Sequence, residues 1–186
     1  MDLDLTRTSP ELMIKRINED NGLTGDTALD LSEVSMDLPF EVPPDAEGRD
    51  ISVLLLSVPL VRYRGDQTVY AKRIDSAEYF ANTYTDPVRL KVMDAVTTRD
   101  LITRLNSLYH LAILPNEVED NPIDWSQWEE IGGGVPHIIV FKESYVFRGT
   151  LKVLIGDEYA QFDIQTEPGA PVLLENGQVM TFDTIL

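Results

Sequence analysis

The amino-acid sequence predicts an α+β protein with two related modules, each one helix plus antiparallel strands, and an additional C-terminal β-hairpin. Two segments repeat apolar residues at helical spacing, and several short apolar runs are bounded by Gly, Pro or Asn turns. The same order of segments occurs twice along the chain. With 186 residues, 43% of them hydrophobic, the chain is long enough to bury a core in one or two domains.

The first predicted helix begins near Ser9, a suitable N-cap that is followed by Pro10 and by an acidic residue. Its apolar residues recur at helical spacing from Leu12 to Ile17, and Asn21-Gly22 is typical of a helix C-terminus.

Strands follow in the first module. A short strand is possible at 31–38, and the proline-rich stretch 39–48 must be a loop. A buried strand is expected at 49–59, with two further strands at 60–64 and 68–74. Residues 75–95 give no clear pattern apart from an alternating strand at 88–92.

The second module repeats this order. A helix capped by Thr97 or Thr98 carries an apolar stripe, and a long polar loop covers 115–136. Buried strand 138–141 follows. Strands 151–155 and 158–164 flank Gly156-Asp157.

The C-terminal hairpin is predicted from Asn176-Gly177, which separates strands 172–175 and 178–182. Asn-Gly favours a type I′ turn because both central residues need positive φ.

The two modules match in sequence. Residues of the first helix recur 88 positions later, and Tyr63-Arg64-Gly65 corresponds to Phe147-Arg148-Gly149 at an offset of 84. We therefore expect a duplicated unit, with domains at 1–96 and 97–186. The identities of the helical match are Ile14/Ile102, Arg16/Arg104, Asn18/Asn106 and Leu23/Leu111.

These segments resemble a duplicated helix-plus-β-hairpin module in virion structural proteins of large tailed bacteriophages. The resemblance lies in 14–23, in 101–118, in Tyr63-Arg64-Gly65 with Thr68-Val69-Tyr70, and in Arg73-Ile74-Asp75 with Phe80. It covers most of 10–155 in the family's order. It implies a non-enzymatic virion component, assembled in the bacterial host cytoplasm, that contacts other virion proteins and copies of itself in the head, tail or baseplate.

The charge is strongly negative and unevenly distributed. The net value is −17, divided as −9 over 1–50, +2 over 51–114 and −10 over 115–186. This balance argues against a nucleic-acid binder, and no apolar run is long enough to cross a membrane. The acidic N-terminus lacks the basic region of a signal peptide. The basic residues of the middle third are either solvated or dock onto an acidic face of a neighbouring copy.

No catalytic, metal or cofactor site is expected. There are no cysteines, and His110 and His137 lack metal-ligand spacing. Gly132-Gly133-Gly134 is not followed by the lysine of a phosphate-binding loop, and no Gly-x-Ser-x-Gly elbow occurs. The many acidic pairs are interpreted as surface charge.

The candidate interface combines an aromatic pair with basic residues. Trp125 and Trp128 are three residues apart, so in a helical turn they share a face. They either pin the long loop to its own domain or anchor a neighbouring subunit. The other candidates are Arg62, Tyr63, Arg64 and Lys72.

Two other classes of function stay open. An acidic inhibitor that mimics DNA and binds a host DNA-binding protein would need carboxylates spaced regularly along one face, whereas here they are scattered. An enzyme would need a deep polar pocket.

Overall fold

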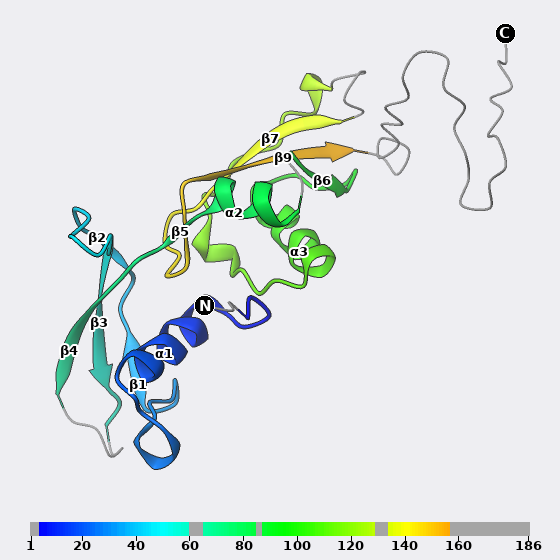
Figure 1. Ribbon diagram of the computed structural model, residues 1–186. Helices are drawn as coiled ribbons and strands as arrows, with labels where there is room; N and C mark the ends of the chain where they lie inside the picture. The colour runs from blue at the N-terminus through cyan, green and yellow to red at the C-terminus, as the bar shows by residue number, and fades with distance from the viewer. Residues whose placement is uncertain (1–3, 60–64, 85–86, 129–133, 157–186) are drawn as a thin grey trace, which may run out of the picture.

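The computed structural model describes residues 4–59, 65–84, 87–128 and 134–156, and it confirms the α+β class (Figure 1). The α-helices are α1 (Ser9–Asp20), α2 (Ser76–Thr83) and α3 (Thr98–Tyr109). The strands are β1 (Val34–Met36), β2 (Phe40–Glu41), β3 (Ile51–Ser57), β4 (Asp66–Ala71), β5 (Ile74–Asp75), β6 (Val88–Lys91), β7 (Val135–Val140), β8 (Phe147–Arg148) and β9 (Thr150–Gly156). Three short 3₁₀ helices lie at Gly25–Thr27, Pro115–Glu117 and Trp125–Gln127.

Capping side chains determine where the helices begin. The N-cap of α1 is Thr8 rather than Ser9, and Thr8 forms a capping box with Glu11. In α3, Thr97 forms the same arrangement with Asp100. The α2 helix lies in the stretch that had no clear pattern, and it begins at Asp75, whose carboxylate accepts from an amide of the first turn.

The first sheet is built around β3. This strand pairs antiparallel with β1 and β2 on one side and with β4 on the other. The strand predicted at 68–74 corresponds to β4, which pairs with β3, while the strand predicted at 60–64 lies outside the described residues. One face of the sheet packs against α1 in a small hydrophobic cluster. The cluster consists of Met13, Ile51, Val53, Leu55 and Ala71.

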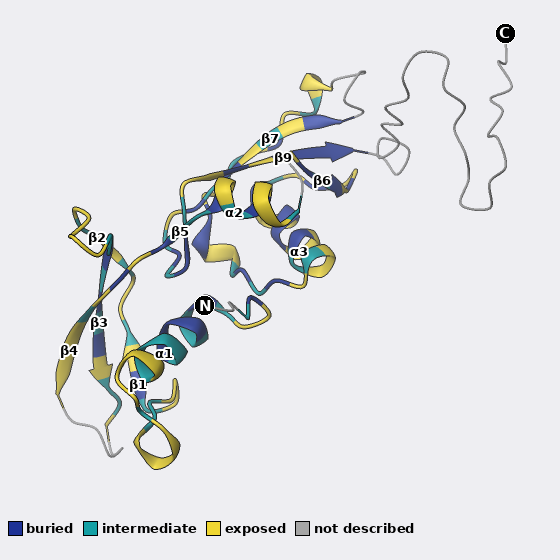
Figure 2. Ribbon diagram, in the orientation of Figure 1, coloured by how far each residue is buried: buried dark blue, intermediate teal, exposed yellow. Residues whose placement is uncertain are grey.

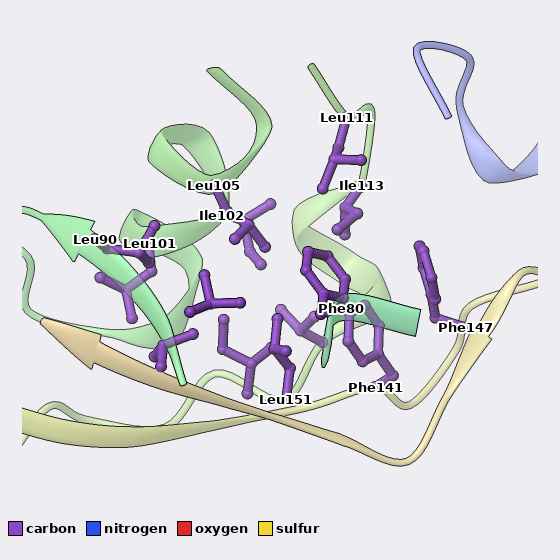
Figure 3. Close-up of a cluster of buried hydrophobic side chains, with 14 of the residues drawn as sticks. Phe80, Leu90, Leu101, Ile102, Leu105, Leu111, Ile113, Phe141, Phe147 and Leu151 are labelled. Atoms are coloured by element: carbon purple, nitrogen blue, oxygen red, sulfur yellow. The ribbon is translucent and has the colours of Figure 1, made fainter. Parts of the chain in front are cut away.

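The second sheet is built around β9, which pairs antiparallel with β7 and in parallel with β6. The helices α2 and α3 cover one face and close a larger core, whose side chains Figure 3 shows and whose burial Figure 2 shows. The expectation that 138–141 is fully buried is wrong, because Ile138 points away from the core and is 52% exposed. The predicted strands 158–164, 172–175 and 178–182 lie outside the described residues.

The two hairpins, β3–β4 and β7–β9, have the same register. All six Cα pairs from Ile51↔Ala71 onward become the pairs from Val135↔Ile155 onward when 84 is added. The pair Val34↔Ser57 likewise becomes the bridge Val118↔Phe141. Duplication of the sequence stays a prediction, but the two backbones correspond at these positions.

Both helices are also tied to the next segment in the same way. The side chain of Asn18 exchanges two hydrogen bonds with the backbone of Leu29, at 2.9 and 2.7 Å. The side chain of Asn106 does the same with Ile113, at 2.7 and 3.1 Å. These identical asparagines therefore fix the turn after each helix.

The segment between the hairpins belongs with the second sheet. The helix α2 contributes Phe80 to the larger core, and β6 contributes Val88 and Leu90. The predicted domain boundary between 96 and 97 thus falls inside a continuous hydrophobic cluster. The two sheets are further joined by β5 and β8, which pair in parallel.

Candidate interaction surfaces

The basic half of the predicted interface is described only at Lys72, since Arg62, Tyr63 and Arg64 lie outside the described residues. Lys72 follows β4 directly and is exposed. Its carbonyl oxygen accepts a hydrogen bond from Arg16 Nη1 at 3.1 Å, so α1 and the end of β4 meet here.

The two tryptophans have different environments. Trp125 is half-buried against the larger core, and its Nε1 donates to the carbonyl of Ala95 at 3.0 Å. Trp128 is 39% exposed. Both belong to the second half of the molecule, whereas Lys72 belongs to the first. Only Trp128 therefore presents a large open surface, a difference that the spacing of the two residues could not indicate.

The outer face of the first sheet, which we define by Phe40, Leu54, Leu56 and Tyr70, presents these four apolar side chains among the polar residues Ser35, Ser52, Asp66 and Thr68. Phe40 and Tyr70 are 72% and 56% exposed, and both pair with Ser52 of β3. Figure 2 shows β2 and most of β4 in the exposed colour. Aromatic side chains that are held by a sheet and exposed together are typical of a surface that binds another protein.

A buried ionic cluster joins the first sheet to the second. Asp50 and Arg73 are each about 5% exposed as side chains, and Arg73 Nε donates to Asp50 at 3.1 Å. Arg148 Nη1 of β8 reaches the same carboxylate at 3.3 Å, while Arg73 Nη2 donates to Glu41 at 2.7 Å.

Burial raises the pKa of Asp50, but the Arg73 amide and guanidinium outweigh this effect and hold the pKa below its usual value. The carboxylate is therefore ionised. The ionised Asp50 carboxylate therefore contributes to the free energy of unfolding above the ordinary aspartate pKa. This contribution is lost as the pH falls through the depressed pKa of Asp50.

Glu117 is the second buried acid, and nothing in the sequence distinguishes it from the acidic residues at the surface. It is 1% exposed, and neither carboxylate oxygen has a hydrogen-bond partner among the described residues. Burial raises its pKa to about 7, although Ser9 and Ser144 lie close enough to oppose the rise. The side chain sits where the start of α1 meets the second half of the chain.

The histidines do not form a site. Nε2 of His137 lies 2.8 Å from Thr98 Oγ1, and burial lowers the pKa of its ring. His110 ends α3 with a φ of 53°. In the part of the chain that the structure describes, no group of three His, Asp or Glu residues could hold a metal ion.

No helix in the described ranges is long and apolar enough to cross a membrane.

Comparison with protein families gives one match, over residues 2–164, to a family described as "Family of unknown function (DUF7941)". No curated protein matches the chain. No solved structure matches it either.

Proposed function

The chain belongs to the family of unknown function DUF7941, and we propose that it is a non-enzymatic structural component of a tailed bacteriophage virion. In this role it contacts other virion proteins and further copies of itself in the head, tail or baseplate.

The outer face of the first sheet carries this proposal. A monomer gains nothing from presenting Phe40 and Tyr70 on one sheet face, because exposed aromatic surface costs free energy in water. Burial of that face against a neighbouring protein would contribute about 25 cal/mol of favourable free energy per Å² of apolar surface removed from water. The resemblance of residues 10–155 to modules of virion proteins supplies the kind of neighbour.

Polar groups would determine orientation. The acidic surface outside the middle third and the basic residues within it have opposite signs, so like faces repel and unlike faces attract. Such complementarity fixes register and speeds encounter more than it adds affinity.

The test is incorporation into particles. Chains with Phe40→Ser and Tyr70→Ser should be lost from purified particles, measured by quantitative mass spectrometry, while the isolated protein keeps its circular dichroism spectrum. Trp128→Ala tests the other exposed candidate, and Trp125→Ala is not suitable because it also removes a core contact. A control is Leu108→Ser, an exposed apolar residue of α3.

Absence of the unaltered protein from purified particles would contradict the proposal. Capture of a host nuclease or polymerase instead would favour the acidic inhibitor.

A further inference from the structure

The outer edge of β4 pairs with no strand among the described residues, whereas the outer edge of β9 is paired with β6. The strands β4 and β9 are equivalent in the two hairpins, because adding 84 to the residue numbers of each β3–β4 pair gives a β7–β9 pair. Along β9, the strand β6 covers Val153 to Gly156. The corresponding positions on β4 and just after it are Val69 to Lys72.

The hydrogen bonds show that the backbone of this edge points outward. Ser57 N–H donates to Gly65 at 3.1 Å, and Phe141 N–H donates to Gly149 at 3.0 Å. Alternation along an antiparallel strand then turns the N–H and C=O of Tyr70 away from β3, as it turns those of Leu154 away from β7.

The side chains at these two positions differ in exposure. Tyr70 is 56% exposed, and Leu154 is 7% exposed. Two side chains occupy carbonyls of the β4 edge, namely the half-buried Arg16 on the Lys72 carbonyl and the exposed Gln67 on the Thr68 carbonyl. Both can be displaced, so the edge is available to a strand.

A segment similar in sequence to the one that covers β9 occurs further along the chain. The strand β6 begins in the sequence Pro87-Val88-Arg89-Leu90, and Pro171-Val172-Leu173-Leu174 occurs 84 positions later. Residues 172–175 are also predicted to form a strand by the Asn176-Gly177 turn that follows them. The strand β6 therefore follows the β3–β4 hairpin at the same distance in sequence as residues 172–175 follow the β7–β9 hairpin.

We propose that residues 172–175 of one copy add as a parallel strand to the outer edge of β4 in a second copy. The register of β6 on β9 places Leu173 beside Tyr70 and Glu175 beside Lys72. Glu175 replaces the basic Lys91, so an acid meets Lys72 and the nearby Arg16. Charge complementarity therefore favours this occupant.

The position of β9 favours a second copy over the same one. Figure 1 shows that the end of β9 and the β3–β4 hairpin lie at opposite ends of the described part of the molecule. A contact from the tail of one copy to the first sheet of the next is heterologous, so it generates a ring or a filament. The proposed contact can be tested with purified protein alone, and it does not depend on the proposed virion role.

Disulfide trapping tests the proposal in the full chain, which has no cysteine of its own. Leu173→Cys protein is mixed with Tyr70→Cys protein, oxidised and run on a non-reducing gel. A dimer-sized band is expected. The matched control is Asp66→Cys, on the same strand and face but away from the predicted register, and its band should be absent. Thermal melts confirm that each variant folds.

Three results would overturn the proposal. The first is that Leu173→Cys mixed with Tyr70→Cys gives no dimer. The second is that Leu173→Cys mixed with Asp66→Cys gives as much dimer as the Tyr70→Cys mixture. The third is that the Leu173→Cys/Tyr70→Cys double variant, at low concentration, forms the disulfide within one chain. The charge pair gives a further check. Adding Glu175→Lys should lower the dimer yield, and Lys72→Glu in the other chain should restore it. A yield unchanged by both would contradict the register.

Discussion

The β3–β4 and β7–β9 hairpins share one register, but their surroundings differ. The β9 strand has neighbours on both edges, and two helices cover one face of its sheet. Among the described residues, the β4 strand pairs on one edge only, and its sheet packs against α1, Leu29 and Tyr145. A shared backbone frame therefore does not fix exposure. Exposure depends on which additional segments pack against each hairpin.

The segment that makes this difference is the connection between the hairpins. It contributes β5, α2 and β6, all of which join the second half. The first half is left with a small core and an open outer face. It depends on contacts with the second half, through the ionic cluster at Asp50 and through Tyr145, which donates its hydroxyl to the carbonyl of Asp37 at 2.9 Å.

The largest effect is expected from Arg73→Ala, which tests that dependence. Removal of the guanidinium leaves the buried Asp50 carboxylate with Arg148 as its remaining cation. Loss of one partner of a buried pair costs about 3–5 kcal/mol. We expect urea unfolding to shift by this amount, with the circular dichroism signal beginning to fall before the fluorescence of Trp125 in the second half changes.

The control for Arg73→Ala is Arg49→Ala. Arg49 pairs with Asp45 at 2.6 Å, but both side chains are more than one-third exposed. Exposed pairs contribute little to stability because water screens them. Equal losses from the two substitutions would show that burial of the Asp50 cluster does not hold the halves together.

The next effect sharpens the comparison at equivalent positions. Leu154→Ala removes a buried side chain on the covered strand, and such changes cost about 2–5 kcal/mol. Tyr70→Ala, 84 positions earlier, removes an exposed side chain, and surface changes usually lie within about 0.5 kcal/mol. Denaturant midpoints measured on dilute protein give both values. Similar losses would mean that Tyr70 is also covered in solution.

The sequence predicted the parts of the fold that local patterns determine. Helical spacing located α1 and α3, and apolar runs located β3 and the centre of β9. It missed α2, because only Phe80 of that helix is fully buried along with Ser76 and the apolar pattern is weak. It also missed that β6 pairs in parallel with β9, since nothing in a strand of four residues indicates a partner 65 positions away.

The candidate surfaces were harder to predict. Lys72 and Trp128 are exposed, but Trp125 packs against the core, and three-residue spacing cannot distinguish these outcomes. The outer face of the first sheet was missed because Phe40 lies in a proline-rich stretch that was read as a loop. Asp50 and Glu117 were hidden among 32 acidic residues, and only tertiary contacts separate them from the rest.

The third comparison concerns Glu117, which lies 84 positions after Glu33 in the other half of the chain. The raised pKa of Glu117, about 7 against an ordinary 4.5, means that the folded state holds a proton that the unfolded state has released. Stability is therefore highest below about pH 4.5 for this group and falls as pH rises to about 7.

Glu117→Gln should remove this fall and raise stability at pH 8 by up to about 3 kcal/mol, since one pKa unit is worth about 1.4 kcal/mol. Urea unfolding of both proteins between pH 4 and pH 8 measures the difference. His137 has a lowered pKa and contributes a slope of opposite sign, but that slope is common to both proteins. Glu33→Gln is the matched control. Glu33 is only half-buried, so a profile flattened as much by Glu33→Gln as by Glu117→Gln would show that burial at Glu117 is not the cause.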